Sequence, residues 1–206
     1  MKLTIATFLS LDGVMQAPGG PDEDRSGGFE HGGWSYPYSD EDMGQAVDGW
    51  FEAADAFLLG RKTYEIFAAH WPHVTDEANQ VATKLNRLPK YVASKTLDKV
   101  EWNNSTLLEG DAADAAAKLK GEPGNELQVH GSGNLAQTLI KHDLIDEYRL
   151  FVYPVVIGNG KRLFADGAVP AALKLVDTKT TSSGIVISTY QPAGALEHGS
   201  FALDDQ

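Results

Sequence analysis

Two glycine-containing turns, one after residue 59 and one after residue 130, have the composition of anion-binding sites. The segments read Leu58-Leu59-Gly60-Arg61-Lys62-Thr63 and Val129-His130-Gly131-Ser132-Gly133-Asn134-Leu135. Each follows an apolar run that predicts a strand and precedes a pattern that predicts a helix. The first amides of a helix lack intrahelical partners, the helix dipole is positive there, and glycine lets a phosphate approach the backbone closely. Two such turns predict a diphosphate held from two sides, as in a dinucleotide.

Neither turn fits the common nucleotide-binding motifs. The segment 131–136 has the spacing G-x-G-x-x-A, but a Rossmann domain carries an acid at the end of the next strand, about twenty residues on. That position falls in the apolar segment 154–157. The segment 60–63 is similar to the end of a Walker A loop, but Asp55 stands where the first glycine would be and Arg61 where the lysine would be. We therefore exclude a standard Rossmann domain and a P-loop.

The composition predicts one domain with an acidic surface. The 206 residues include 17 basic and 29 acidic side chains, giving a net charge of −12. Such a surface repels nucleic acid and anionic membranes, so a phosphate site must be a local exception. The absence of cysteine excludes disulfides, a thiolate nucleophile and cysteine-ligated zinc. We also expect no metal site, since His70 and His73 are separated by the helix breaker Pro72 and lack a third ligand.

The apolar run at the start of the chain, Leu3–Leu9, is too short for an export signal or a membrane span. It predicts a strand instead. We therefore expect a cytoplasmic protein.

Strands and helices alternate along the part of the chain that positions the two turns. Predicted strands cover Leu3–Leu9, Asp55–Leu59, Lys90–Ser94, Thr106–Glu109, Glu126–His130 and Glu147–Val156. Predicted helices cover Asp40–Ala54, Arg61–His70, Asp76–Leu88, Ala112–Leu119 and Asn134–His142. The runs Ala172–Thr181 and Ile185–Gln191, joined by Ser182–Gly184, predict a hairpin. The pattern predicts an α/β fold: a mainly parallel sheet with helices on both faces and a C-terminal antiparallel hairpin. Residues 1–192 form this domain, and the acidic tail 193–206 is expected to be weakly ordered.

The order of several short motifs resembles the dihydrofolate reductase superfamily. They are the segment Leu59–Glu65, the strand Tyr91–Ser94 and the turn Gly131–Gly133. The segments Ser10–Gly13 and Tyr153–Gly160 look more like the branch related to the reductase domain of riboflavin biosynthesis. The resemblance covers residues 2–191. It implies a dihydrofolate-reductase-like fold, NADPH as cofactor and a homodimer.

The resemblance also implies which residues bind the cofactor. The first turn and the residues after the next strand would bind the diphosphate and the 2′-phosphate: Gly60, Arg61, Lys62, Thr63, Ser94 and Lys95. The second turn would close on the diphosphate near the nicotinamide: Gly131, Ser132, Gly133, Asn134 and Leu135. The alternative is that both are tight turns between strand and helix, with Lys62 a solvated surface charge. The cations Arg61, Lys62 and Lys95 favour the phosphate interpretation.

Candidate residues on the substrate side each have two interpretations. Asp12 either caps a turn or acts as a catalytic and substrate-binding group. Trp34 and Tyr36, in the glycine-rich segment 13–38, either pack or form a stacking wall for a flat substrate. Gly158 either serves a turn or contacts substrate. The long segment itself is expected to be a lid.

Two departures from the family pattern leave the substrate open. Val14 stands where the riboflavin-pathway reductase has a basic residue, and we expect no accompanying deaminase domain. The substrate-binding carboxylate of folate reductases would fall at Gly44.

We therefore predict an NADPH-dependent reductase that transfers a hydride to a small pteridine- or aminopyrimidine-like heterocycle. The alternatives are a nucleotide-binding or sensing protein without turnover, and an interaction domain that binds no nucleotide. Because the cofactor carries the hydride chemistry, few catalytic side chains are expected. The late strands 150–156 and 185–190 are apolar on both faces, which also predicts a homodimer built around the C-terminal half.

Overall fold

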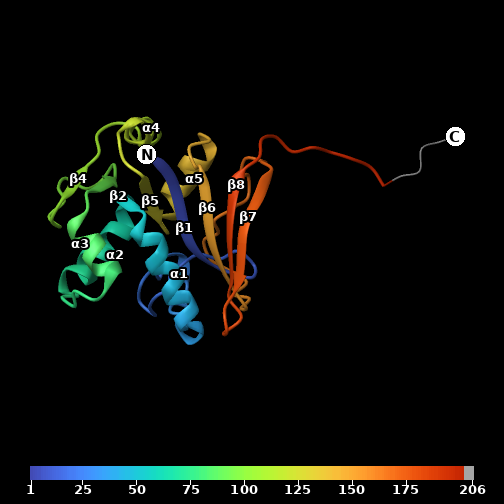
Figure 1. Cartoon of the computed structure of the whole chain (residues 1–206), viewed down its shortest axis with the longest axis horizontal. Coiled ribbons are helices and arrows are strands. Elements are labelled where there is room, and N and C mark those ends of the chain that lie inside the picture. The colour runs from blue at the N-terminus through green and yellow to red at the C-terminus, as the bar shows by residue number, and fades with distance from the viewer. Residues whose placement is uncertain (202–206) are drawn as a thin grey trace.

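The computed structural model describes residues 1–201 and contains an eight-stranded sheet with the order β4-β3-β2-β5-β1-β6-β8-β7 (Figure 1). The strands are β1 (Lys2–Ser10), β2 (Ala54–Gly60), β3 (Lys90–Ala93), β4 (Ser105–Leu107), β5 (Glu126–His130), β6 (Glu147–Tyr153), β7 (Leu173–Thr180) and β8 (Val186–Pro192). Pairing is parallel from β4 to β6, whereas β8 runs antiparallel to both β6 and β7. The predicted mainly parallel sheet with a C-terminal hairpin is confirmed.

Helices cover both faces of this sheet, as predicted. They are α1 (Glu41–Glu52), α2 (Arg61–His70), α3 (Gln80–Arg87), α4 (Ala112–Gly121) and α5 (Gly133–Lys141), with short 3-10 turns at Ser26–Gly28, Tyr36–Tyr38 and Trp71–His73. Helices α1, α2 and α3 pack on the face that carries Phe57 and Leu59, and α1 crosses in front of the sheet in Figure 1. Helices α4 and α5 pack on the opposite face, against Leu3 and Ile5.

Several predicted elements are shorter in the structure, and two of these differences have a clear local reason. The helix expected from Asp76 begins only at Gln80, because the side chain of Asn79 caps it by accepting the Ala82 amide at 2.9 Å. The strand expected to reach Val156 ends at Tyr153, since Pro154 follows and has no amide to donate to a ladder.

The α1 face of the sheet carries a strip of polar side chains, most of them buried, between two apolar clusters. One cluster surrounds Phe57, and the other surrounds Phe151. Because side chains alternate along a strand, β5 turns Leu127 and Val129 to the opposite face and its polar residues to α1. We call these side chains the polar strip: Glu126, Gln128, His130, Glu147 and Arg149. The strip ends at the carboxyl end of β5.

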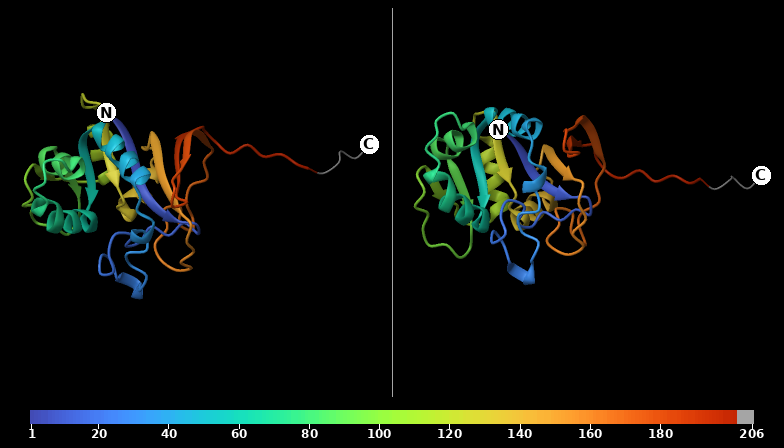
Figure 2. Two further views of the ribbon diagram at one scale, coloured as in Figure 1. Left: turned by 60° about the horizontal axis from the view of Figure 1, so that its bottom comes forward. Right: turned by 90° about the horizontal axis from the view of Figure 1, so that it is seen from below.

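The carboxyl ends of β1, β2, β3 and β5 meet at one edge of the sheet because these strands are parallel. The two glycine turns follow β2 and β5, which are neighbours in the sheet. The segment 13–38 lies below the same edge, as the blue chain in both views of Figure 2 shows. This edge, where ligands of open α/β sheets bind, is where the predicted site must be sought.

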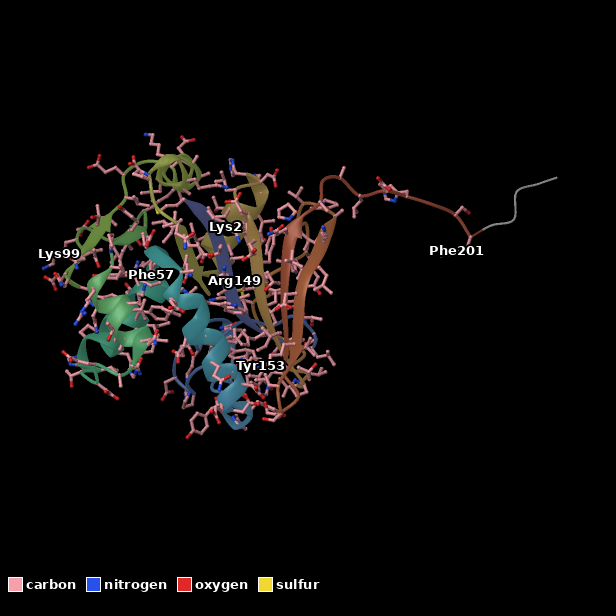
Figure 3. All side chains as sticks on the ribbon, viewed as in Figure 1. Lys2, Phe57, Lys99, Arg149, Tyr153 and Phe201 are labelled. Carbon is pink, nitrogen blue, oxygen red and sulfur yellow. The ribbon has the colours of Figure 1, made fainter. Side chains whose placement is uncertain are left out.

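Beyond β8, residues 193–201 run away from the sheet without regular secondary structure, and Phe201 lies far from the domain (Figure 3). The remainder of the predicted tail, residues 202–206, lies outside the described residues. Within residues 1–201, none of the helices combines the length and the apolar run needed to cross a bilayer.

Candidate functional site

The two glycine turns contact each other directly. The Gly60 amide donates to Oγ of Ser132 at 3.0 Å, and the Ser132 amide donates to Oγ1 of Thr63 at 3.1 Å. A Cβ on Gly60 would lie 3.4 Å from Cβ of Ser132, an ordinary van der Waals distance that shows how closely the two turns approach. Gly131 and Ser132 have φ values of +58° and +57°, which turn the chain sharply between β5 and α5. Two hydrogen bonds from backbone amides to side-chain hydroxyls therefore join the turns.

The helices that follow these turns differ from the other α-helices of the described chain at their N-termini. Helices α1, α3 and α4 are capped by the side chains of Asp40, Asn79 and Asp111. The N-cap residues of α2 and α5, Gly60 and Ser132, make no side-chain capping bond. The first amides and the positive dipole ends of α2 and α5 therefore remain available to an outside anion, side by side.

Both uncapped ends open into a cleft of about 1000 Å³ along the carboxyl edge of the sheet. Every residue predicted to bind the cofactor lines this cleft: Gly60, Arg61, Lys62, Thr63, Ser94, Lys95, Gly131, Ser132, Gly133, Asn134 and Leu135. Their roles stay predictions, but the structure brings all of them together. On the α1 side the wall is mostly apolar and includes Met43, Val47 and Trp50.

Cations and hydroxyl groups gather where β3 ends. Nη1 of Arg61 donates to Oγ1 of Thr96 at 2.6 Å, while its Nε pairs with Glu65 at 2.8 Å. Oγ of Ser94 accepts the Thr96 amide at 3.1 Å, and Lys95 lines the cleft beside them. This set can hold a phosphate monoester through charge-assisted hydrogen bonds. Sequence reasoning missed Thr96, whose only signal was its position directly after Ser94 and Lys95.

Lys62 has a different partner. Its Nζ lies 3.0 Å from Oδ1 of Asp24, whose Oδ2 lies 2.6 Å from Nζ of Lys161. Burial opposes ionisation of Asp24, but hydrogen bonds from Lys161, Ser26 and Lys62 hold its pKa well below the ordinary value. The carboxylate therefore ties the segment 13–38 to α2 across the cleft.

The residues predicted on the substrate side do not line the cleft. Asp12 accepts the amides of Ile157 and Gly158 at 3.0 and 2.8 Å, and these bonds, with the Ser10 hydroxyl foremost, keep its pKa well below the usual range. It thus joins the first loop to the segment containing Gly158. This placement does not support a catalytic or substrate-binding role of Asp12, or a substrate contact of Gly158. These roles stay predictions.

The aromatic candidates are also outside the cleft wall. Trp34 donates through Nε1 to the Gln16 carbonyl at 2.8 Å and packs edge-on against Tyr153, with ring centroids 5.3 Å apart. Tyr36 is 77% exposed. Trp34 packs against its neighbours, and the stacking role of both side chains stays a prediction.

His130, which the sequence analysis treated only as a strand residue, lines the cleft. Its ring stacks on Phe51, with centroids 4.5 Å apart and planes inclined by 25°. Burial, assisted by the positive charge of Arg149, lowers the pKa of His130 to about 3, so the imidazole is neutral near neutral pH. The available signal was the alternation of polar residues at 126, 128 and 130 in an otherwise apolar strand.

The polar strip anchors this histidine. Arg149 donates two hydrogen bonds to Glu126, at 2.6 and 3.0 Å, and a third to Glu147 at 2.9 Å. Its guanidinium also lies 5.6 Å from the ring centre of Trp50 in α1, and Figure 3 labels it over the middle of the sheet. Buried charges are costly unless they are paired, and these bonds pair the charges of the strip.

Comparison with known proteins identifies the family. The model of the RibD C-terminal domain matches residues 1–187. The chain belongs to the RibD C-terminal domain family. Among relatives of this RibD-type chain, the uncharacterized protein YyaP of Bacillus subtilis is 33% identical over 153 residues, which cover 73% of this chain and 80% of YyaP.

Solved structures confirm the dihydrofolate-reductase-like fold. A Thermotoga maritima protein, diaminohydroxyphosphoribosylaminopyrimidine deaminase/5-amino-6-(5-phosphoribosylamino)uracil reductase, superposes with a TM-score of 0.60 at 13% identity, covering 93% of this chain and 56% of that one. Dihydrofolate reductase of Enterococcus faecalis gives a TM-score of 0.58 at 12% identity, covering 93% and 96%. The resemblance expected from the motif order is therefore confirmed.

Proposed function

We propose that this RibD-type protein is an NADPH-dependent reductase that transfers a hydride to a small pteridine- or pyrimidine-like heterocycle. The observation that carries the proposal is the pair of uncapped helix N-termini, α2 and α5, side by side in one cleft. Two adjacent N-termini suit the two phosphates of a dinucleotide better than any single anion. The E. faecalis dihydrofolate reductase structure contains NADP(H), and the T. maritima protein is named as a uracil reductase, which supports this choice of cofactor and substrate class.

The choice of NADPH over NADH rests on the group at the end of β3. Arg61, Ser94, Lys95 and Thr96 supply two cations and two hydroxyls at the same end of the cleft. A 2′-phosphate is the only part of NADPH that NADH lacks, and it needs such partners.

The apolar α1 side would receive the substrate. When bound, NADPH would supply the hydride, and the chain's task is to orient a flat ring and exclude water. Met43, Val47, Trp50 and Phe51 provide apolar surface for this. His130, at the end of the polar strip, adds the hydrogen-bonding imidazole to the residues that line this side of the cleft.

The test is cofactor binding followed by turnover. We expect NADPH to bind and its near-ultraviolet absorbance to decrease with one member of a panel of pterins, aminopyrimidines and quinones. Binding without consumption across the panel would favour the sensing protein, and absence of binding would favour the interaction domain.

Two further parts of the proposal concern setting and assembly. We propose a cytoplasmic location in addition to the reductase activity. A homodimer is proposed because β7, at the sheet edge, exposes Leu175 and Val176, and β8 exposes Val186. An apolar edge strand is the kind of surface that pairs with a second copy.

A further inference from the structure

The hydrogen bonds around Gln128 fix the orientation of its amide. Nε2 of Gln128 lies 2.6 Å from the Trp50 carbonyl and 2.7 Å from Oε2 of Glu126. Both neighbours are acceptors, so the nitrogen of the amide must face them. Oε1 of Gln128 then faces Nε2 of His130 at 3.1 Å.

This orientation determines the tautomer of His130. Because Oε1 can only accept, Nε2 of the neutral imidazole carries the proton, and Nδ1 is left with a free lone pair. Within residues 1–201 the only hydrogen bond of the His130 ring is the one from Nε2 to Gln128, so Nδ1 has no protein partner. His130 lines the cleft, which is where this lone pair can be reached.

We propose that Nδ1 of His130 accepts a hydrogen bond from a ring N–H of an uncharged heterocyclic substrate, and that His130 thereby selects substrates that carry such a donor. The inference rests on the proposed function, because it places the substrate on the α1 side of the cleft. The stacked ring of Phe51 and the bond to Gln128 hold the imidazole in place. A hydrogen-bond acceptor in a largely apolar wall discriminates strongly against a ligand that cannot donate.

The carboxylates of the cleft are poorer candidates for this role. Those among its described lining residues are Glu23, Asp24 and Asp48. Glu23 already accepts two backbone amides of its own loop, and Asp24 holds two lysines. Asp48 is exposed on α1, where water competes for its hydrogen bonds. Asp48 is therefore the carboxylate whose role must be compared with that of His130, and Asp48→Asn is the variant that does so.

Two variants of His130 separate its two nitrogen atoms. In His130→Gln the new amide nitrogen can still donate to Gln128, but no atom occupies the Nδ1 position. In His130→Asn an amide oxygen can occupy the Nδ1 position, but the donor to Gln128 is lost. Thermal melting and NADPH affinity of each variant control for folding and for the cofactor half of the cleft.

The probes are lumazine, which has two ring N–H groups and no exocyclic amine, and 1,3-dimethyllumazine, which has no N–H donor. Binding is followed by their fluorescence at slightly acidic pH, where lumazine keeps both protons. We expect the wild type to bind lumazine about tenfold more tightly than the dimethyl compound, as one neutral hydrogen bond provides. His130→Asn should retain this preference and His130→Gln should lose it. Nitrogen-15 NMR of the wild-type imidazole should show Nε2 protonated, with the Nδ1 resonance shifting when lumazine binds.

Three results would overturn the inference: binding of neither probe, equal binding of both by the wild type, or an unchanged preference in His130→Gln. In the last case, loss of the preference in Asp48→Asn would assign the acceptor to Asp48 instead. Each leaves the cofactor proposal intact if NADPH binds. Failure of NADPH to bind would instead contradict the proposed function, whatever the probes show.

Discussion

Replacing Arg61 with alanine should remove most of the preference for NADPH over NADH. The guanidinium is 46% exposed and lies within hydrogen-bonding distance of Glu65 and Thr96. A charge-assisted contact to a phosphate contributes about 1.5–3 kcal/mol, or roughly 10- to 150-fold in affinity. Because the Arg61 side chain is half in water and is shared with Glu65, we expect the loss of NADPH affinity to lie at the lower end of this range, about tenfold.

The fold should tolerate this change. The Arg61–Glu65 contact is an exposed pair one helical turn apart, and such pairs contribute only about 0.3–0.5 kcal/mol. Arg61→Ala should therefore melt close to the wild type, and its NADH affinity should be nearly unchanged. Glu65→Gln is the matched control, since it removes the competing carboxylate and should raise NADPH affinity slightly.

The assay is a fluorescence titration of each protein with NADPH and with NADH at low salt, where exposed charges interact most strongly. The relevant quantity is the ratio of the two dissociation constants. Equal affinities of the wild type for both cofactors, or an unchanged ratio in Arg61→Ala, would refute the assignment of this group to the 2′-phosphate.

The remaining predictions concern assembly, the loop and pH. Light scattering at micromolar concentration should show a dimer that Val176→Lys dissociates; a wild-type mass near 22 kDa would contradict it. Amide exchange across residues 13–38 should slow with saturating NADPH and substrate. Asp24→Asn removes the ion pairs to two lysines and should speed this exchange in the free protein. Exchange that NADPH and substrate leave unchanged would mean that the segment is static. The pKa of His130 is about 3 in the folded protein and 6.5 in the unfolded chain. Between these two pH values the imidazole is protonated in the unfolded state and neutral in the folded state. Stability should thus be complete above about pH 6.5 and fall toward pH 3 by up to about 1.4 kcal/mol per pH unit. Denaturant titrations of His130→Asn should show a smaller slope, and an unchanged slope would contradict the assignment to this histidine.

Local sequence was enough to predict the elements and to select residues that the fold brings together in one cleft. The helix Arg61–His70 and the strand Glu126–His130 have the predicted bounds, because apolar periodicity, Gly60 and the Trp71–Pro72 stop act within a few residues. The residues assigned to the cofactor follow strand ends, and parallel strands bring such ends to one edge whatever their order.

The sequence could not determine what depends on which strands are neighbours. β5 lies between β2 and β1, and only this order puts Ser132 against Gly60 and Thr63. Asp12 was visible as a carboxylate after β1, but its partners, the amides of Ile157 and Gly158, lie 145 and 146 residues further along the chain.

The sequence also could not determine the protonation state and tautomer of His130. The sequence places a histidine before a glycine turn, a position compatible with a general base, a cation or a packed side chain. Only the tertiary structure buries it against Phe51, near Arg149, and directs Nε2 to Gln128. Desolvation and hydrogen-bond geometry are set by atoms distant in sequence, so the charge and tautomer of this imidazole are properties of the fold and not of the local chain.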